Sequence, residues 1–352
     1  MALPFLSRGG KMRDQIVVVD LGTRTTKAVY LQRRGDDYTL ARYAILDAPV
    51  VDKTPSPDLL GEHLKKVSES LEVKAKRIGL AVGANDSVLR TAELPLMSAQ
   101  DMRLMLKFTS KNYLQQDFPD HVFDCHILPP RQGAAEPAKG TPRCRVLVGA
   151  ARKQLLSDWQ AAAKIAGLTA DQIAPGLIGP VNAFERAHPD IFLKEIVALV
   201  DIGFKSSTIN VLAAGELMLS RVLPFGGDKL TSGLADAMGI SYAEAEGIKV
   251  GMPQEVESTL QPLIVPLGRE LRASIDFFEH QQDKVVGQIF VSGGSARSEF
   301  IVQNLQTELM VPCKRWNPVT FLNPTLPPQQ MGEVEQIAPQ LTVAVGVAMA
   351  VA

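Results

Sequence analysis

One short sequence pattern occurs twice in this chain of 352 residues, and it constrains the fold more than any other feature. Residues 20–31 read DLGTRTTKAVYL, and residues 201–212 read DIGFKSSTINVL. In each copy an apolar run precedes the aspartate and a second apolar run follows the hydroxyl residues. Each copy therefore predicts a strand, a tight turn and a second strand. Two copies half a chain apart predict two lobes of related construction.

The residue types in this repeated turn suit the binding of phosphate and a hydrated magnesium ion. An aspartate at a strand end offers a carboxylate to Mg²⁺, which keeps several waters and takes one or two carboxylates. The glycine lets the backbone approach phosphate oxygens, and successive N–H groups form an anion-binding concavity. We therefore expect a phosphate site near Asp20, Asp201 and Lys27. The alternative is a pair of solvated strand-end turns.

Elsewhere in the chain, apolar runs alternate with segments of helical period, which predicts an α/β protein with largely buried sheets. Strands are expected at 77–82, 87–95, 144–151 and 288–294, and helices at 58–71, 98–114, 153–168, 262–281 and 298–310. The Pro-, Gly- and Ala-rich segment 129–143 predicts a surface loop between two strands. The apolar residues 341–352 predict a buried final helix.

Composition excludes several classes of protein. With 37 basic and 38 acidic residues, the chain lacks the basic footprint of a dedicated nucleic-acid binder. No strongly apolar run reaches about 18 residues, so we expect no direct membrane span. The three cysteines are far apart and predict neither a disulfide framework nor a metal site. The P-loop pattern is absent from the sequence, which excludes a P-loop protein.

A third motif, FVSGGSAR at 290–297, makes the chain recognisable. In this order, DLGT, DIG and VSGGSAR resemble the phosphate-1, phosphate-2 and adenosine motifs of the actin, Hsp70 and FtsA superfamily. More narrowly, RTAELPLMSAQDMRLMLKF (90–108) and LPFGGDKLTSGLADAMGISYAEAEGIKVG (223–251) are similar to stretches of the PilM family, the actin-like ATPases of type IV pilus assembly. The resemblance runs from about residue 14 to the end.

The resemblance implies an α/β fold of two actin-like lobes, duplicated ribonuclease H-like units, with an FtsA-type inserted subdomain. The first lobe would comprise residues 14–83, 151–195 and 341–352, and residues 84–150 would be the insertion. The second lobe would comprise residues 196–340, with its own small subdomain at about 231–284. A nucleotide would lie in the cleft between the lobes.

The resemblance also implies a site for ATP or ADP with Mg²⁺. Asp20 and Asp201 would be catalytic and would hold Mg²⁺ through water. Glu246 and Lys249, three residues apart on one helix, would hydrogen-bond ribose and adenine; alternatively they form a solvated surface pair. The other implied nucleotide contacts are Gly22, Thr23, Thr25, Thr26, Lys27, Gly203, Ser206, Ser207, Gly226, Gly227, Gly293, Gly294, Ser295 and Arg297.

Two departures from the family's pattern predict slow or absent ATP hydrolysis. Phe204 stands where the family tends to have a small residue, and it would crowd the γ-phosphate. Gly179 and Pro180 occupy a region where the superfamily often has an acidic or amide side chain that orients the attacking water. Asn182 is the nearest candidate for that role, which phosphoryl transfer to water requires.

The implied function is a cytoplasmic, nucleotide-binding adaptor for type IV pilus or related secretion assembly, recruited to the inner membrane through a partner. It would bind the N-terminal peptide of a PilN-like membrane protein in a groove between the first lobe and the insertion. Other pilus inner-membrane components and self-association are further expected partners. The apolar floor of the groove would be Leu94, Leu96, Met97, Met102 and Met105, unless these are core residues.

Two alternative functions stay open. An FtsA-like filament-forming ATPase would end in a basic amphipathic membrane helix, whereas residues 341–352 contain no Lys or Arg. A metabolite kinase of the same superfamily would need a further carboxylate base near its substrate, and no extra aspartate motif or long insertion indicates one.

Overall fold

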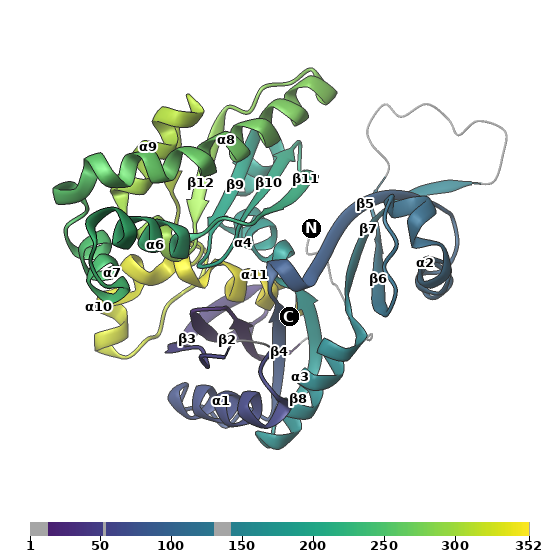
Figure 1. Cartoon of the computed structure of the whole chain (residues 1–352). Coiled ribbons are helices and arrows are strands. Elements are labelled where there is room, and N and C mark those ends of the chain that lie inside the picture. Colours follow the sequence, from purple (N-terminus) through teal and green to yellow (C-terminus); the bar gives the residue numbers. More distant parts are fainter. Residues whose placement is uncertain (1–12, 52–53, 130–141, 352) are drawn as a thin grey trace.

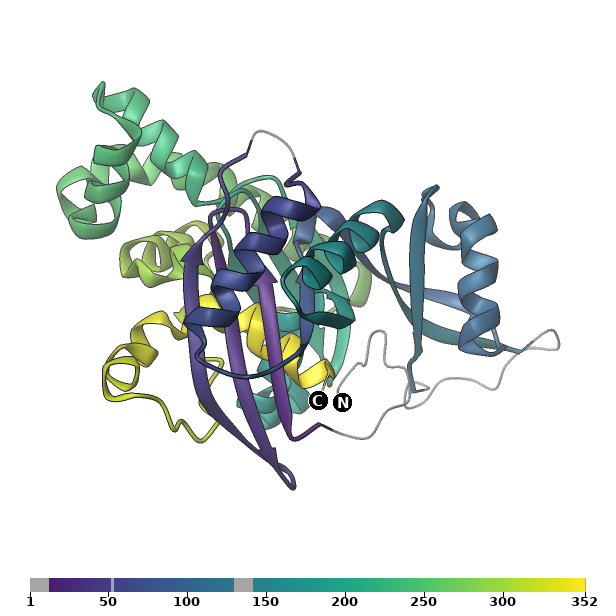
Figure 2. The same cartoon turned by 90° about the horizontal axis from the view of Figure 1, so that it is seen from below.

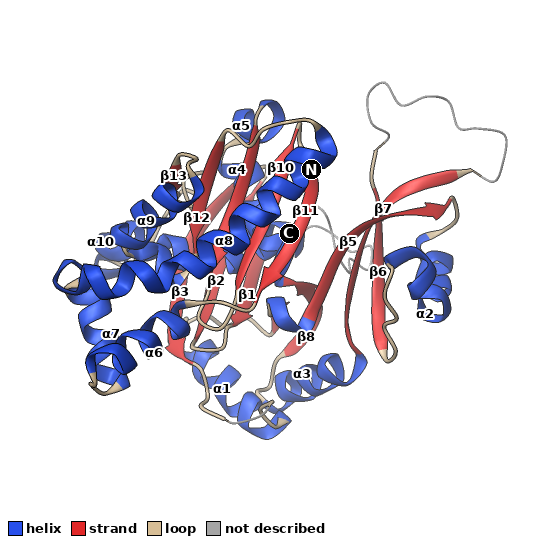
Figure 3. Ribbon diagram, turned by 45° about the horizontal axis from the view of Figure 1, so that its top comes forward, coloured by secondary structure: helices blue, strands red, loops and turns tan. Residues whose placement is uncertain are grey.

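The computed structural model describes residues 13–51, 54–129 and 142–351 of the chain. These residues form two five-stranded sheets and one three-stranded sheet, with helices packed against them (Figures 1 and 3). Most of the loop expected at 129–143 lies outside the described residues.

The first sheet has the strand order β3-β2-β1-β4-β8. Its first three strands form an antiparallel meander, and β4 and β8 add in parallel. The strands are β1 (Gln15–Leu21), β2 (Thr25–Arg34), β3 (Asp37–Asp47), β4 (Arg77–Val82) and β8 (Thr169–Pro175). Helices α1 (Pro57–Ser70) and α3 (Lys153–Ile165) bury their apolar faces against one side of this sheet, as seen from below in Figure 2.

The second sheet repeats this topology with the order β11-β10-β9-β12-β13. Again three antiparallel strands are followed by two parallel ones. The strands are β9 (Ile196–Ile202), β10 (Ser207–Ala213), β11 (Glu216–Leu223), β12 (Gln288–Ser292) and β13 (Cys313–Arg315). The sheet is contacted by α8 (Glu257–Gln282), η4 (Gly294–Arg297) and α9 (Glu299–Leu309). The helical elements α6 (Gly227–Met238), α7 (Tyr242–Gly251) and η3 (Pro253–Val256) pack against one another and α8, and they share the same outer core. The prediction of two related lobes is confirmed.

The third sheet, antiparallel with the order β5-β7-β6, is built between β4 and α3 and projects to one side (Figure 1). It comprises β5 (Ser87–Pro95), β6 (His121–Ile127) and β7 (Arg143–Arg152), and η1 (Ala84–Asp86) leads into it. Helix α2 (Ala99–Leu114) covers one face, and the hydroxyl of its N-cap Ser98 accepts a hydrogen bond from the Asp101 amide.

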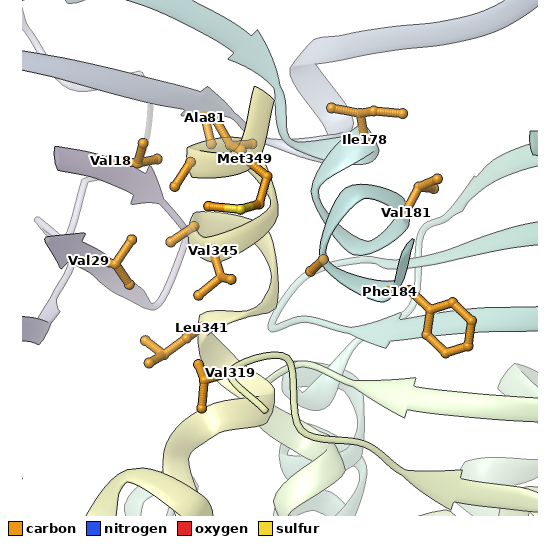
Figure 4. Packing of buried hydrophobic residues seen from close by; sticks show 14 of the residues in the cluster. Val18, Val29, Ala81, Ile178, Val181, Phe184, Val319, Leu341, Val345 and Met349 are labelled. Carbon is orange, nitrogen blue, oxygen red and sulfur yellow. The ribbon is translucent and has the colours of Figure 1, made fainter. Parts of the chain in front are cut away.

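One hydrophobic core lies between the two five-stranded sheets and belongs to both lobes. Because side chains alternate along a strand, Val18 of β1 and Leu199 of β9 face this core, while Val17 and Val200 face outer cores. Helices α4 (Gly179–Ala187), which follows η2 (Gly176–Ile178), and α11 (Thr342–Val351) fill the space between the sheets. Figure 4 shows Val345 of α11 in this layer.

The backbones of α4 and α11 touch at two glycines. A methyl group at Gly346 would overlap the carbonyl oxygen of Gly179, and one at Gly179 would lie 2.8 Å from the carbonyl oxygen of Val343. The Nδ2 of Asn182 donates to the carbonyl oxygen of Gly346 at 3.2 Å. Side chains larger than hydrogen at these glycines are therefore incompatible with this helix crossing.

The helical segment Pro328–Val351 comprises α10 (Pro328–Ile337), η5 (Ala338–Leu341) and α11. By length and composition it could cross a membrane, but 72% of its most apolar window is buried inside the protein. This burial is that of a core helix, and α11 packs against α4, β1, β2 and β4. The expectation of a buried final helix is confirmed.

The start of the long helix α8 differs from the prediction. It begins at Glu257 rather than Pro262, and Pro262 and Pro266 lie inside it. An internal proline costs roughly 3 kcal/mol. The apolar face that contains Leu260 and Ile264 is fully buried, and this burial holds the helix together across the prolines. The strands β8 and β13 and the helix α10 also lie outside the predicted elements.

Gly346→Ala is expected to destabilise the protein by at least about 2 kcal/mol, because the added methyl must push α11 away from α4. Urea unfolding followed by circular dichroism measures the change. Gly332→Ala in α10 is the matched control, since a Cβ there meets no atom within 4 Å. It should be neutral or stabilising by up to about 1 kcal/mol. Equal effects of the two substitutions would contradict the close crossing.

Candidate functional site

A cavity of about 540 Å³ lies between the two lobes. This volume is within the range of small-molecule sites. Both repeated turns, the start of α6, one face of α7 and the η4 turn contribute to its wall. The predicted residues that line it are Asp20, Gly22, Thr23, Thr25, Lys27, Asp201, Gly203, Ser206, Gly227, Glu246, Lys249, Gly294, Ser295 and Arg297.

The two repeated turns have the same local geometry. A Cβ at Gly22 would lie 2.6 Å from the carbonyl oxygen of Thr25, and one at Gly203 would lie 2.8 Å from that of Ser206. Only glycine allows the chain to turn this tightly at both positions. Asp20, at the end of β1, is paired in register with Lys27 on β2. The sequence repeat is therefore a repeat of backbone shape.

The carboxylates of the two turns lie in a poorly solvated part of the cavity. The Nζ of Lys27 is 3.7 Å from Oδ2 of Asp20, and the hydroxyl of Ser292 donates to Oδ2 of Asp201 at 2.8 Å. Burial raises the pKa of Asp20, although Lys27 partly offsets it. Burial also raises the pKa of Asp201 to about 6, against the opposing effects of Ser292 and Lys27. Two carboxylates that share one lysine leave a negative site, which a cation would stabilise.

The pair Glu246 and Lys249 faces the cavity and is not a solvated surface pair. Lys249 is only 7% exposed, and its Nζ lies 2.7 Å from Oε2 of Glu246. The same Nζ donates to Oγ1 of Thr231 at 2.6 Å. Burial opposes ionisation of Glu246, but hydrogen bonds from Lys249 and Thr231, with the charge of Arg24, lower its pKa. The prediction that both residues share one helix face is confirmed by the ion pair.

Two predicted contact residues, Thr26 and Ser207, lie behind the cavity wall. The Oγ1 of Thr26 is 2.7 Å from Nε2 of His63, because alternation along β2 turns it away from Lys27. The hydroxyl of Ser207 donates to the carbonyl oxygen of Phe225 at 2.7 Å. The predictions that Thr26 and Ser207 face the cavity are therefore wrong.

Gly226 and Gly293 also do not line the cavity, contrary to prediction. A Cβ at Gly226 would overlap the carbonyl of Phe204. Gly293 has φ of 91°, and a Cβ there would lie 2.5 Å from the carbonyl oxygen of Ile202. These glycines allow neighbouring loops to pack against the second turn.

The prediction that Asn182 orients a water at the cavity is wrong. Asn182 is 1% exposed, and its amide is hydrogen-bonded within the α4–α11 crossing. The wall near α4 is formed by Gly176, Leu177 and Pro180. The polarity of an asparagine does not reveal which face of a short helix is buried, and that is why the sequence misled here.

Several polar or aromatic residues line the cavity without having been predicted. They are Arg24, Asp47, Asn85, Asp86, Trp159, Lys205, Thr208, Ser298, Gln336 and Gln340. A signal exists for two of them: Gln336 and Gln340 are four residues apart, a spacing that places two residues on one helix face. Arg24, Asp47, Asn85 and Asp86 lie at strand ends or in short turns, and Trp159 lies within α3; one sequence gives no indication of what lies opposite them.

Part of the predicted partner groove is core. Leu94 and Met102 are fully buried between α2 and the third sheet, so they cannot contact a partner. Met97 and Met105 are partly buried against the same core, whereas Leu96 is 56% exposed. Helical spacing placed Met102 on the apolar face of α2, and the sheet covers that face.

A small apolar groove does lie between the third sheet and the first lobe. It is lined by Val82, Val122, Phe123, Asp124, Gly149, Ala150, Ala151, Leu156, Ile173, Ala174 and Pro175. Val122 is 39% exposed and lies on β6, an edge strand of its sheet. Edge strands carry unpaired backbone groups that can pair with an added chain.

Comparison with known proteins identifies relatives of this arrangement. A family model described as type IV pilus assembly protein PilM matches residues 18–352. A solved PilM–PilN type IV pilus biogenesis complex is similar with a TM-score of 0.83 and 21% identity, covering 97% of this chain and 100% of that chain. MreB5 of Spiroplasma citri bound to AMPPNP has a TM-score of 0.52 and 11% identity, with 96% and 95% covered. These likenesses show a two-lobed actin-like fold.

A local relative is the cell division protein FtsA of Bacillus subtilis (strain 168). It is 43% identical over 53 residues, which are 15% of this chain. The matched stretch spans only 12% of the length of that protein.

Asp201→Asn is expected to stabilise the ligand-free protein above pH 6. The folded-state pKa of Asp201, about 6, exceeds the ordinary aspartate pKa of 3.8, so ionisation destabilises the fold as pH rises from 3.8 to about 6. Asparagine removes that cost, on the order of 1 to 2 kcal/mol after solvent screening. Urea unfolding at pH 8 and pH 4.5 measures the gain. A gain that grows as pH falls would contradict the raised pKa.

Proposed function

The chain belongs to the PilM family of type IV pilus assembly proteins, and from this premise we propose that it binds ATP or ADP between its lobes and a partner peptide beside them. The observation that carries the nucleotide proposal is the convergence of two similar glycine turns, two carboxylates and a lysine on one cavity. Neither turn alone is specific, but facing copies supply anion donors from both sides.

The phosphates would lie between the two turns. Backbone N–H groups near Gly22 and Gly203 and the hydroxyls of Thr23, Thr25 and Ser206 provide donors for phosphate oxygens. Lys27 adds a positive charge. The start of α6 at Gly227 also lines the cavity, and the positive end of the helix dipole there favours an anion.

The nucleoside would lie against the second lobe. Glu246 offers a carboxylate to ribose hydroxyls, and Gly294 and Ser295 offer a flat backbone surface. Arg297 also lines the cavity and can stack on a base. Lys249 keeps Glu246 ionised and in place through their 2.7 Å ion pair.

Magnesium fits the donor set as a hydrated ion. Among the described residues, no cluster of three or more His, Cys, Asp or Glu side chains could hold a metal. The carboxylates of Asp20 and Asp201 suit Mg²⁺, which takes one or two carboxylates together with water and phosphate oxygens. The bound ion would supply charge neutralisation for the phosphates.

We expect slow hydrolysis at this site. The wall beside α4 presents Gly176, Leu177 and Pro180, and none of these side chains can orient water. The protein would therefore work mainly as a nucleotide-dependent adaptor.

The partner site would be the apolar groove between the third sheet and the first lobe. The PilM–PilN structure is a complex with PilN, and by analogy we propose an N-terminal peptide of a PilN-like inner-membrane protein as occupant. Such a peptide can pair with the edge of β6 while an apolar side chain packs over the groove, whose volume is about 20 Å³. In this proposal, residues 84–150 act as the partner-binding unit, and the partner recruits the protein to the inner membrane.

Lys27→Gln is expected to weaken binding of ATP with Mg²⁺ at least about tenfold, because it removes a charged phosphate contact. Calorimetric titration measures the affinity. Lys194→Gln, which removes an exposed lysine paired with Asp190 on α5 (Pro189–Lys194), should bind like the unmodified protein.

Absence of nucleotide binding by the unmodified protein would refute the nucleotide proposal. Steady phosphate release that is lost in Asp201→Ala would contradict the expectation of slow hydrolysis, while leaving nucleotide binding supported.

Val122→Glu is expected to weaken binding of the PilN-type N-terminal peptide at least about tenfold, because it places a charge in an apolar groove. Fluorescence anisotropy of the labelled peptide measures its affinity. The control is Val285→Glu, at a 73% exposed valine outside the groove. Equal affinity for the two variants would rule out this groove as the peptide site.

A further inference from the structure

Arg24 of the first turn reaches across the cavity to the second lobe. Its guanidinium carbon is 5.5 Å from the centroid of the Phe204 ring, and both residues line the cavity. Its charge also acts on Glu246, whose pKa it helps to lower. Arg24 is thus a side chain of one lobe held over an aromatic face of the other.

Arg24 differs from the other cations of the two turns because its charge is not committed to a carboxylate. Lys27 pairs with Asp20, and Lys205, which occupies the position equivalent to Arg24 in the sequence repeat, pairs with Asp228 at 2.6 Å. Within residues 13–51, 54–129 and 142–351, no ion pair or side-chain hydrogen bond of the Arg24 guanidinium is found. Its cation is available to a ligand.

The ring of Phe204 is carried by a rigid turn. The Phe204 carbonyl oxygen accepts a hydrogen bond from the Asp228 amide at 2.9 Å, and the neighbouring Gly203 carbonyl accepts one from Gly227 at 2.9 Å. Gly226 packs against the Phe204 carbonyl with no room for a side chain. These contacts fix the backbone that carries the ring, and the Nζ of Lys205 also lies 5.3 Å from the ring centroid. Stacking on this ring favours positions of the flexible Arg24 side chain in the space between the turns.

We propose that Arg24 binds the terminal phosphate and distinguishes a nucleoside triphosphate from a diphosphate, and that Phe204 positions it. The inference rests on the proposed nucleotide site. A guanidinium can donate two parallel hydrogen bonds to a phosphate, and a cation held in the gap between the turns meets the phosphate farthest from the nucleoside. The Phe204 ring, which we expected to crowd that phosphate, would instead support the arginine that binds it.

The test compares affinities for ADP and for a non-hydrolysable ATP analogue, each with Mg²⁺, by calorimetric titration. Arg24→Ala should weaken binding of the triphosphate analogue about ten- to hundredfold, and it should weaken binding of ADP by less than about threefold. Arg24→Lys should recover part of the loss, because it keeps the charge without the planar donor pair. Phe204→Leu should reduce the preference for the triphosphate about three- to tenfold, and Phe204→Tyr should retain it.

The matched control is Arg33→Ala. Arg33 also stacks on an aromatic ring, with its guanidinium carbon 5.9 Å from the centroid of Tyr38, but it lies outside the cavity. It should leave the ratio of the two affinities unchanged. If Arg24→Ala leaves the ratio of the affinities for the ATP analogue and ADP unchanged, the proposed role of Arg24 is wrong. The proposed nucleotide site would not be affected by that result. Failure of the unmodified protein to bind either nucleotide would overturn both.

Discussion

The contact between the backbones of α4 and α11 fixes the relation of the two lobes, and the cavity depends on it. Gly179 and Gly346 let the helices meet without intervening side chains, and the apolar layer around them belongs to both sheets (Figure 4). Leu177 before α4 and Val343 of α11 form part of the cavity wall. Any change that separates these helices therefore moves one turn relative to the other and changes the space available to a ligand.

The electrostatics of the cavity complement this geometry. Asp20 and Asp201 are partly desolvated and share Lys27, so the ligand-free protein carries a cost that a hydrated cation with phosphate oxygens would relieve. Arg24, on the first turn, forms no ion pair among the described residues, and in our proposal it binds the terminal phosphate. The chain belongs to the PilM family of type IV pilus assembly proteins, and in the function that we propose this cavity holds the nucleotide.

Local sequence signals predicted the two turns, whereas tertiary packing determined which side chains face the cavity and which are buried. Gly22 and Gly203 could be placed from the sequence because a tight turn imposes glycine wherever the chain folds. The side to which Thr26 points, and the buried position of Asn182, depend on α1 and α11, which are distant in the sequence. Likewise, the sequence shows that Met102 is an apolar helix residue, but only its packing against the third sheet shows that it is a core residue and not part of a binding surface.

A crystal structure with Mg²⁺ and a non-hydrolysable ATP analogue tests the central claim most directly. The account predicts phosphate density between the turns at Gly22 and Gly203. It also predicts a metal ion that contacts Asp20 and Asp201 through bound water, and ribose beside Glu246. Nucleotide density outside this cavity, or an empty cavity at saturating nucleotide concentration, would contradict it.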